Sequence, residues 1–250
     1  MSDSNESLID KSARLVVSFF LASAGLWLLV AAGLAYVVAA KSTDPTFLGS
    51  CEFLTYGKVK AAQTNAFVYG WASNAVFAVS IWLLARLGQA EVRGRFYLIV
   101  AGAVWNLAIT LGLGGILAGH MTSSDLMEMP VVLWPALLVS YFVIAAMIFV
   151  LHRSRVNRET YVTQWFVLAS FLWFPALFLV AWQGLELNPG RGTVQSVVSM
   201  WYSQNVIWLW ITPIALGSAY YLIPKILGRP IEKYYLAIFG FWCIAFLAPW

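Results

Sequence analysis

The side chains that could do chemistry within the apolar stretches of this sequence are amides and hydroxyls. Gln63 and Asn74 are eleven positions apart in one stretch, which places them near one face of a helix. A later stretch carries Gln204 and Asn205, followed by Thr212. Such groups usually form hydrogen bonds between membrane helices. They would support binding only if they converged on a cavity.

Groups that commonly bind metals or move protons in membranes are absent from the middle of these stretches. His120 and His152 each end an apolar stretch beside polar residues, which is typical of solvated interface histidines. One histidine at each membrane surface cannot supply two axial haem ligands from one leaflet. Cys51 and Cys243 lie at different expected depths, so we expect no disulfide between them.

The elements that must position these groups are long apolar segments. A bilayer-spanning helix needs about 20 apolar residues. Six segments free of acidic and basic residues are long enough: 15–40, 61–85, 96–119, 130–151, 161–182 and 194–224. A seventh apolar segment begins near Tyr234 and continues to Trp250.

The composition also indicates an integral membrane protein. Hydrophobic residues make up 61% of the chain, charged residues 10%, and the mean hydropathy is +0.78. Outer-membrane strands would alternate apolar and polar residues, which these segments do not do. We therefore predict an all-α, polytopic transmembrane helix bundle with six complete helices and the start of a seventh. It forms one domain over residues 1–250, with a short cytoplasmic tail at 1–14, and the first helix is expected to be retained.

The distribution of basic residues predicts the orientation. Eleven of the fifteen lysines and arginines lie on the N-terminal side of the predicted bundle. Basic residues concentrate in cytoplasmic loops, so we expect the N-terminus in the cytoplasm. The net charge of +4 is explained by this asymmetry, and no nucleic-acid partner is expected.

Several short motifs resemble subunit I of the haem-copper oxidases, closest to the cbb-type cytochrome c oxidases. The sixth segment and the loop after it carry WYSQN at 201–205, YYLIPK at 220–225 and GRP at 228–230. The second segment carries QTNA at 63–66 and NAVFA at 74–78. Further matches are RE at 158–159, VTQWF at 162–166 and FW at 241–242. The similarity runs through much of residues 53–250, whereas the first, third and fourth helices match by position and hydropathy.

The resemblance also shows two departures at metal-ligand positions. It implies an axial histidine of low-spin haem b at the position of Gln63, and a histidine on the copper of the oxygen-reducing centre at the position of Gln204. An amide is a weak ligand compared with imidazole. It keeps similar size and hydrogen-bonding capacity. Tyr202 and Thr212 could line a polar path, as residues of this region do in the family.

The resemblance implies that further ligands would follow Trp250, because the chain corresponds to about the first half of a twelve-helix subunit. Our leading hypothesis is a degenerate, non-catalytic protein that binds no haem or copper in this chain. It would be a structural or assembly component of a respiratory electron-transport complex in the bacterial inner membrane. Its partners would be lipid and other subunits, with a c-type cytochrome subunit as a candidate. We expect Gln63 and Gln204 to face inward, where hydrogen bonds satisfy their neighbours.

Two alternatives stay open. The first is a functional oxidase that retains haem b and copper, oxidises cytochrome c or quinol and reduces oxygen. Its missing ligands would come from residues after 250 or from a partner chain. The second is a transporter of an uncharged solute, because charged intramembrane groups are absent from this sequence.

Overall fold

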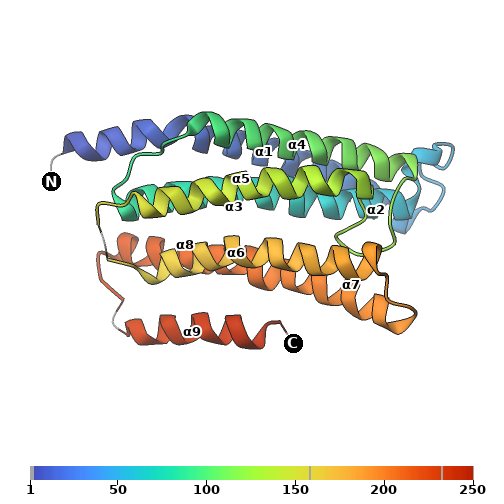
Figure 1. The fold of residues 1–250 in the computed structure, drawn as a ribbon. Coiled ribbons are helices and arrows are strands. Elements are labelled where there is room, and N and C mark those ends of the chain that lie inside the picture. The colour runs from blue at the N-terminus through green and yellow to red at the C-terminus, as the bar shows by residue number, and fades with distance from the viewer. Residues whose placement is uncertain (1–2, 158, 232, 250) are drawn as a thin grey trace.

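The computed structural model describes residues 3–157, 159–231 and 233–249. Arg158, within one of the quoted motifs, and Trp250 lie outside the described residues. The described chain is all-helical, as predicted, and its helices lie side by side as a bundle (Figure 1). The α-helices are α1 (Asp3–Thr43), α2 (Tyr56–Asn65), α3 (Ser73–Gly88), α4 (Arg95–Ala118), α5 (Trp134–Arg153), α6 (Val162–Trp182), α7 (Thr193–Asn205), α8 (Thr212–Leu227) and α9 (Tyr234–Leu247).

Three π-helical segments interrupt or extend these helices. They are η2 (Ala66–Ala72) between α2 and α3, η4 (Gln183–Leu187) after α6, and η5 (Val206–Ile211) between α7 and α8. Two 3-10 turns, η1 (Glu52–Leu54) and η3 (Val131–Leu133), lie in the loops. π-helical turns often mark functional sites in helices. Here η2 and η5 come directly after the segments that contain Gln63 and Gln204.

Six helical segments of the described chain are long and apolar enough to span a bilayer, which confirms the six predicted helices. The seventh, α9, is apolar but shorter. Helix ends differ from the expectation in two places. The first helix begins at Asp3, so residues 3–14 of the predicted tail continue it, and the second begins at Tyr56 rather than near residue 61. Both helices continue through polar residues beyond their apolar parts, because helical backbone hydrogen bonds form with polar side chains as well.

The arrangement has layers, with α1 and α4 on one side, α3 and α5 next, then α6 with α7 and α8, and α9 outermost (Figure 1). Hydrogen bonds tie these layers together. Asn74 on α3 and Asn106 on α4 exchange amide hydrogen bonds of 3.0 and 3.1 Å, and the Trp27 indole of α1 donates to Asn106 at 2.7 Å. The expectation that intramembrane amides join helices is confirmed for Asn74 and Asn106.

The join between α6 and α8 depends on a proline. Pro213 has no backbone N–H, so it cannot donate to the Leu209 carbonyl one turn earlier. The Ser170 hydroxyl of α6 donates to that carbonyl at 3.4 Å and also to the carbonyl of Trp210. A side-chain hydroxyl of α6 therefore donates to a backbone carbonyl that Pro213 cannot serve, which suits a low-dielectric membrane interior.

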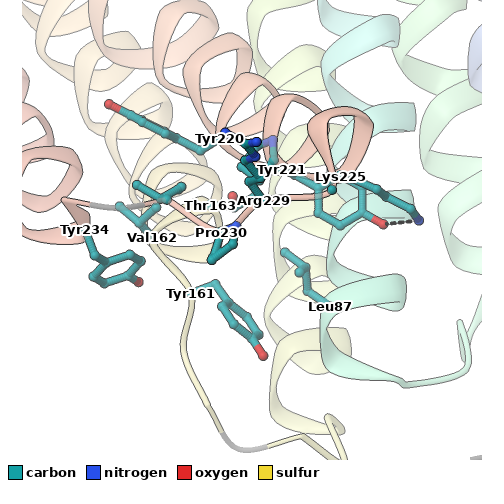
Figure 2. Close-up of a pocket in the computed structure, with 13 residues that line it drawn as sticks. Leu87, Tyr161, Val162, Thr163, Tyr220, Tyr221, Lys225, Arg229, Pro230 and Tyr234 are labelled. Carbon is teal, nitrogen blue, oxygen red and sulfur yellow. Dashed lines mark hydrogen bonds between the residues drawn. The ribbon is translucent and has the colours of Figure 1, made fainter.

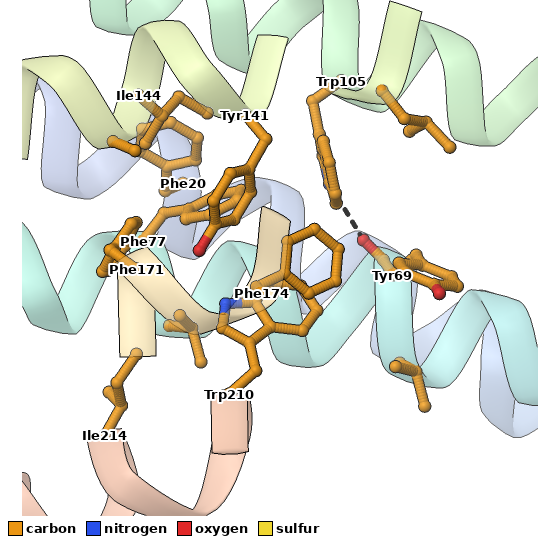
Figure 3. Packing of buried hydrophobic residues seen from close by; sticks show 14 of the residues in the cluster. Phe20, Tyr69, Phe77, Trp105, Tyr141, Ile144, Phe171, Phe174, Trp210 and Ile214 are labelled. Carbon is orange, nitrogen blue, oxygen red and sulfur yellow. Dashed lines mark hydrogen bonds between the residues drawn. The ribbon is translucent and has the colours of Figure 1, made fainter. Parts of the chain in front are cut away.

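An aromatic cluster fills the middle of the bundle (Figure 3). Its fully buried members come from η2, α3, α4, α5, α6 and η5 and include Tyr69, Phe77, Trp105, Tyr141, Phe174 and Trp210. The ring centroids of Phe174 and Trp210 are 4.0 Å apart, and those of Tyr141 and Phe174 are 4.5 Å apart. Dispersion between these large rings, added over many contacts, stabilises the packing of five helices against one another.

We predict that Gly102→Ala destabilises the bundle, because a Cβ at this α4 position would lie 2.7 Å from ring atoms of Phe19 and Phe20. Overpacking of this kind costs about 1–3 kcal/mol. Denaturant unfolding in mild detergent measures it. Gly114→Ala on the same helix is the matched control, because nothing lies within 4 Å of its Cβ position. Equal stability of the two variants would contradict the close approach of α1 and α4.

Candidate functional site

The structure brings only some of the predicted site residues together. Tyr202 is fully buried in the bundle, Gln63 is half-buried on α2, and Thr212 is half-buried at the start of α8. Gln204 is exposed on the surface of α7, so the expectation that it faces inward is wrong for the described chain. The buried side of this segment contains Tyr202 and Asn205. Gln204 is one position before Asn205, so its side chain points about 100° away around the helix.

Two asparagines occupy equivalent places in the two segments. Asn65 is the last residue of α2 before η2, and Asn205 is the last residue of α7 before η5. Each buried amide donates to the carbonyl four residues earlier, Asn65 to Ala61 at 2.9 Å and Asn205 to Trp201 at 2.8 Å. These bonds hold the side chains against their own helices at the points where the helical pitch changes.

A pair of tyrosines joins the two segments. The hydroxyl oxygens of Tyr69, in η2, and Tyr202, in α7, are 2.7 Å apart. The Tyr69 hydroxyl also donates to the Leu126 carbonyl at 2.6 Å, so the proton between the tyrosines comes from Tyr202. The Tyr69 carbonyl accepts hydrogen bonds from Ser73 and, at 3.0 Å, from the Trp105 indole. Tyr69 therefore connects α7, α4 and the loop that contains Leu126.

That loop, residues 119–130 between α4 and η3, folds over the end of the bundle near α2 and α7. The Asp125 backbone N–H donates to the Ser199 hydroxyl of α7 at 3.1 Å. The Glu128 side chain, 8% exposed, accepts a hydrogen bond of 2.6 Å from the Asn65 amide. The loop thus contributes a carboxylate to the same junction that the tyrosine pair crosses.

A cavity of about 560 Å³ opens at this junction. Polar lining residues come from three elements: Lys60 and Thr64 from α2, Asp125 and Glu128 from the loop, and Ser203 from α7. Thr64 and Ser203 are the chain neighbours of Gln63 and Gln204. The two predicted ligand positions therefore flank one polar cavity, although Gln204 itself points away from the buried stripe.

Burial raises the pKa of Glu128 above its ordinary value of 4.5, and the nearby Asp125 carboxylate adds to the increase. The Asn65 amide opposes this shift, because its hydrogen bond favours the ionised carboxylate. The site therefore holds a carboxyl group with a higher proton affinity than one in water, beside amide and hydroxyl donors.

The residues at the two predicted ligand positions do not fit the ligands that the resemblance implies. Both side chains are amides, and an amide offers haem iron or copper only a weak oxygen donor. Across the described residues, no group of three or more His, Cys, Asp or Glu side chains is arranged to hold a metal ion. The donor chemistry of this part of the chain suits hydrogen bonding.

Sequence reasoning missed Tyr69, Glu128 and Trp105 as members of this site. Tyr69 and Trp105 looked like apolar helix residues, and Glu128 looked like a solvated loop residue. Asn65 and Glu128 are separated by 63 positions, so their pairing has no local signal. One sequence signal could have pointed to this site: an asparagine follows each predicted ligand position, Asn65 two residues after Gln63 and Asn205 one residue after Gln204.

The raised pKa of Glu128 predicts how stability depends on pH. A carboxyl group whose pKa is higher in the folded than in the unfolded protein favours the folded state when it is protonated. This contribution to the unfolding free energy is complete below the unfolded-state pKa of 4.5 and is lost as pH rises through the folded-state pKa. We therefore expect Glu128→Gln, which keeps the acceptor for Asn65, to gain stability relative to the wild type as pH rises from 4.5 towards neutrality. Unfolding in detergent across this range measures it. Glu52→Gln removes an exposed carboxylate as control, and parallel pH profiles for wild type and Glu128→Gln would refute the effect.

The hydrogen bonds of the tyrosine pair predict that removing the Tyr69 hydroxyl lowers the unfolding free energy more than removing the Tyr202 hydroxyl. Tyr69→Phe leaves the Leu126 carbonyl without its donor and the Tyr202 hydroxyl without its acceptor, so we expect a loss of about 1–2 kcal/mol of unfolding free energy. Tyr202→Phe removes only one bond and should cost less. The double variant should cost less than the sum of the two. Additive losses in denaturant unfolding would show that the hydroxyls are not coupled, and Tyr97→Phe on the exposed side of α4 is the control.

Comparison with known proteins gives the same family over nearly the whole chain. Residues 15–250 match the family described as cytochrome c and quinol oxidase polypeptide I. The chain is 25% identical over 246 residues to the Cbb3-type cytochrome c oxidase subunit CcoN1 of Stutzerimonas stutzeri, covering 94% of this chain and 51% of that protein. It is 26% identical over 246 residues to cytochrome c oxidase subunit 1 of Rhodobacter capsulatus, covering 90% and 44%.

A third relative is the cytochrome c oxidase subunit 1 homolog of Azorhizobium caulinodans, 25% identical over 241 residues, with 86% of this chain and 40% of that protein covered. The chain thus spans about half the length of the curated relatives it matches. The resemblance drawn from the motifs is confirmed by these matches, and six apolar spanning helices agree with it. The chain is a multi-pass membrane protein and belongs to the cytochrome c and quinol oxidase polypeptide I family.

Proposed function

We propose that this chain is a non-catalytic, subunit I-like component that supports the structure or assembly of a respiratory membrane complex. The observation that carries the proposal is the presence of amides at two separate positions, Gln63 and Gln204, where the family resemblance expects imidazole ligands. A single replacement could tune a site. Two replacements, on two different helices, remove a haem ligand and a copper ligand together.

Contacts around these positions support the same proposal. Asn65, two residues after Gln63, uses its amide on Ala61 and Glu128, and Tyr202, two residues before Gln204, is engaged by Tyr69. Helices α2 and α7 are therefore held by hydrogen bonds between protein groups. A scaffold of this kind needs no metal to keep its helices together, which suits a structural role.

The proposal includes a location and a class of partner. The excess of basic residues on the N-terminal side supports a proposed location in a bacterial inner membrane with the N-terminus facing the cytoplasm. The relatives are oxidase subunits by name, so the partners proposed for this chain are other subunits of a respiratory complex, with a c-type cytochrome subunit as a candidate. Its bilayer-facing helices make lipid the remaining neighbour.

Deleting the gene for this chain tests the role. A structural or assembly component predicts fewer assembled respiratory complexes, whereas cyanide-sensitive oxygen consumption per mole of haem in the remaining complexes stays unchanged. Native gels of solubilised membranes measure the amount of complex, and an oxygen electrode with reduced cytochrome c measures the turnover. A fall in turnover per haem with a normal amount of complex would contradict the proposal.

A substitution at the first ligand position gives a second test. We expect Gln63→Leu to change unfolding free energy by about 1 kcal/mol, because a half-buried amide contributes only a modest hydrogen-bonding term. The oxygen-consumption rate per haem should equal that of the wild type. Thr110→Val, at an exposed hydroxyl on α4, is the control for loss of a polar group in a spanning helix. A turnover reduced tenfold by Gln63→Leu at unchanged stability would point to a catalytic role.

A further inference from the structure

A second cavity, of about 500 Å³ (Figure 2), lies at the end of the bundle opposite α2 and the polar junction (Figure 1). Its walls come from the last turns of α3 and α8 and from the residues that begin α6 and α9. Two cations, Lys225 and Arg229, belong to the described lining, and that lining contains no carboxylate. Two cations in the lining of a hollow favour an anion as its ligand.

The local structure positions both cations. The Lys225 ammonium donates to the Tyr221 hydroxyl at 3.1 Å and lies 5.3 Å from the centre of the same ring. The chain then turns at Gly228, whose φ of +63° is favourable for glycine, and the Arg229 backbone N–H returns to the Pro224 carbonyl at 3.2 Å. The turn brings Arg229 back beside the end of α8, as Figure 2 shows.

Tyrosine side chains form part of the remaining lining, and the Tyr220 hydroxyl points away from Lys225 in Figure 2. Tyr161, Tyr220 and Tyr234 line the cavity with Tyr221. The Tyr161 hydroxyl donates to Glu159 at 3.1 Å, so one carboxylate lies at the rim and this hydroxyl is engaged. The aromatic walls are of the type that gathers at membrane interfaces, where a ring has an apolar body and a polar end.

Apolar surface continues from the cavity along α8. Ile223 and Leu227, which are 55% and 66% exposed, lie on the side of that helix next to Tyr220 of the cavity lining. An exposed apolar face on a spanning helix lies against acyl chains. A ligand in the cavity therefore has a cationic surface for its head and an apolar surface for its tail.

We propose that this cavity, between α3, α6, α8 and α9, binds the phosphate group of an anionic phospholipid. With the orientation proposed above, on which this inference rests, the cavity lies at the cytoplasmic leaflet, where anionic lipids attract basic side chains. Free phosphate shares the anionic oxygens that Lys225 and Arg229 recognise, but it gains nothing from the apolar face of α8. The site is separate from Gln63 and Gln204, and its occupancy does not depend on whether the protein binds haem.

Lipid titration of the purified full chain in detergent tests the proposal. The probes are phosphatidylglycerol, phosphatidylcholine and inorganic phosphate, and native mass spectrometry counts the lipids retained per protein. We expect phosphatidylglycerol to be preferred to phosphatidylcholine. Lys225→Gln/Arg229→Gln should weaken its retention by roughly tenfold to thirtyfold, because both cations that line the cavity are lost and each contributes several-fold to the attraction for the lipid phosphate.

Two further variants separate the site from general charge. Lys225→Arg/Arg229→Lys keeps both charges and should retain the lipid, while Arg93→Gln/Arg95→Gln removes two exposed charges at the same end and should leave binding unchanged. Equal weakening by the Arg93/Arg95 variant would overturn the proposal in favour of non-specific attraction. Equal retention of phosphatidylcholine would overturn it, and so would thermal stabilisation by inorganic phosphate that matches that by phosphatidylglycerol.

Discussion

The hydrogen bond between the Tyr69 and Tyr202 hydroxyls is the interaction on which the rest of this bundle depends. It joins η2 to α7, and Tyr69 passes the connection on to the Leu126 carbonyl of the covering loop. The same residue accepts the Trp105 indole through its carbonyl. One buried side chain thus fixes the relative positions of the second spanning segment, α4, α7 and the loop. In a low-dielectric interior these bonds are also expensive to leave unmade, which makes the arrangement specific.

The contacts of Tyr69 explain how the core stays ordered with amides at positions 63 and 204. Asn65 and Asn205 end the α-helical parts of their segments, and π-helical turns follow both. Tyr69 and Trp210 lie in those turns and belong to the central aromatic cluster, where Tyr69 contacts Trp105 and Trp210 contacts Phe77 and Tyr141. Protein rings and hydrogen bonds make this packing. Gln63 and Gln204 lie beside this framework, so an amide in either position leaves it intact.

Much of the fold follows from the sequence, because a segment without charges and of spanning length has few alternatives to a membrane helix. The family also follows, since motifs such as QTNA at 63–66 and WYSQN at 201–205 are matched in order. The side of a helix that faces the core is less certain. Gln204 was expected to face inward, yet the buried stripe passes through Tyr202 and Asn205. Most positions of an apolar segment are hydrophobic, so hydrophobic periodicity does not indicate which side of the helix is buried.

The contacts that make the site were beyond prediction for a different reason. Glu128 reaches Asn65 only because the loop at 119–130 folds back over α2, and loop paths are not encoded by local periodicity. The cavity that contains Lys225 and Arg229 likewise combines residues from helices that are far apart in sequence. Sequence patterns identify candidate side chains, whereas tertiary contacts decide which of them share a cavity.

We propose that protein contacts hold this bundle together and that neither Gln63 nor Gln204 is a metal ligand. Haem absorption of the purified protein, read with copper content by mass spectrometry, tests this most directly. We expect neither a low-spin haem b spectrum nor bound copper above background. A stoichiometric haem b spectrum would contradict this proposal.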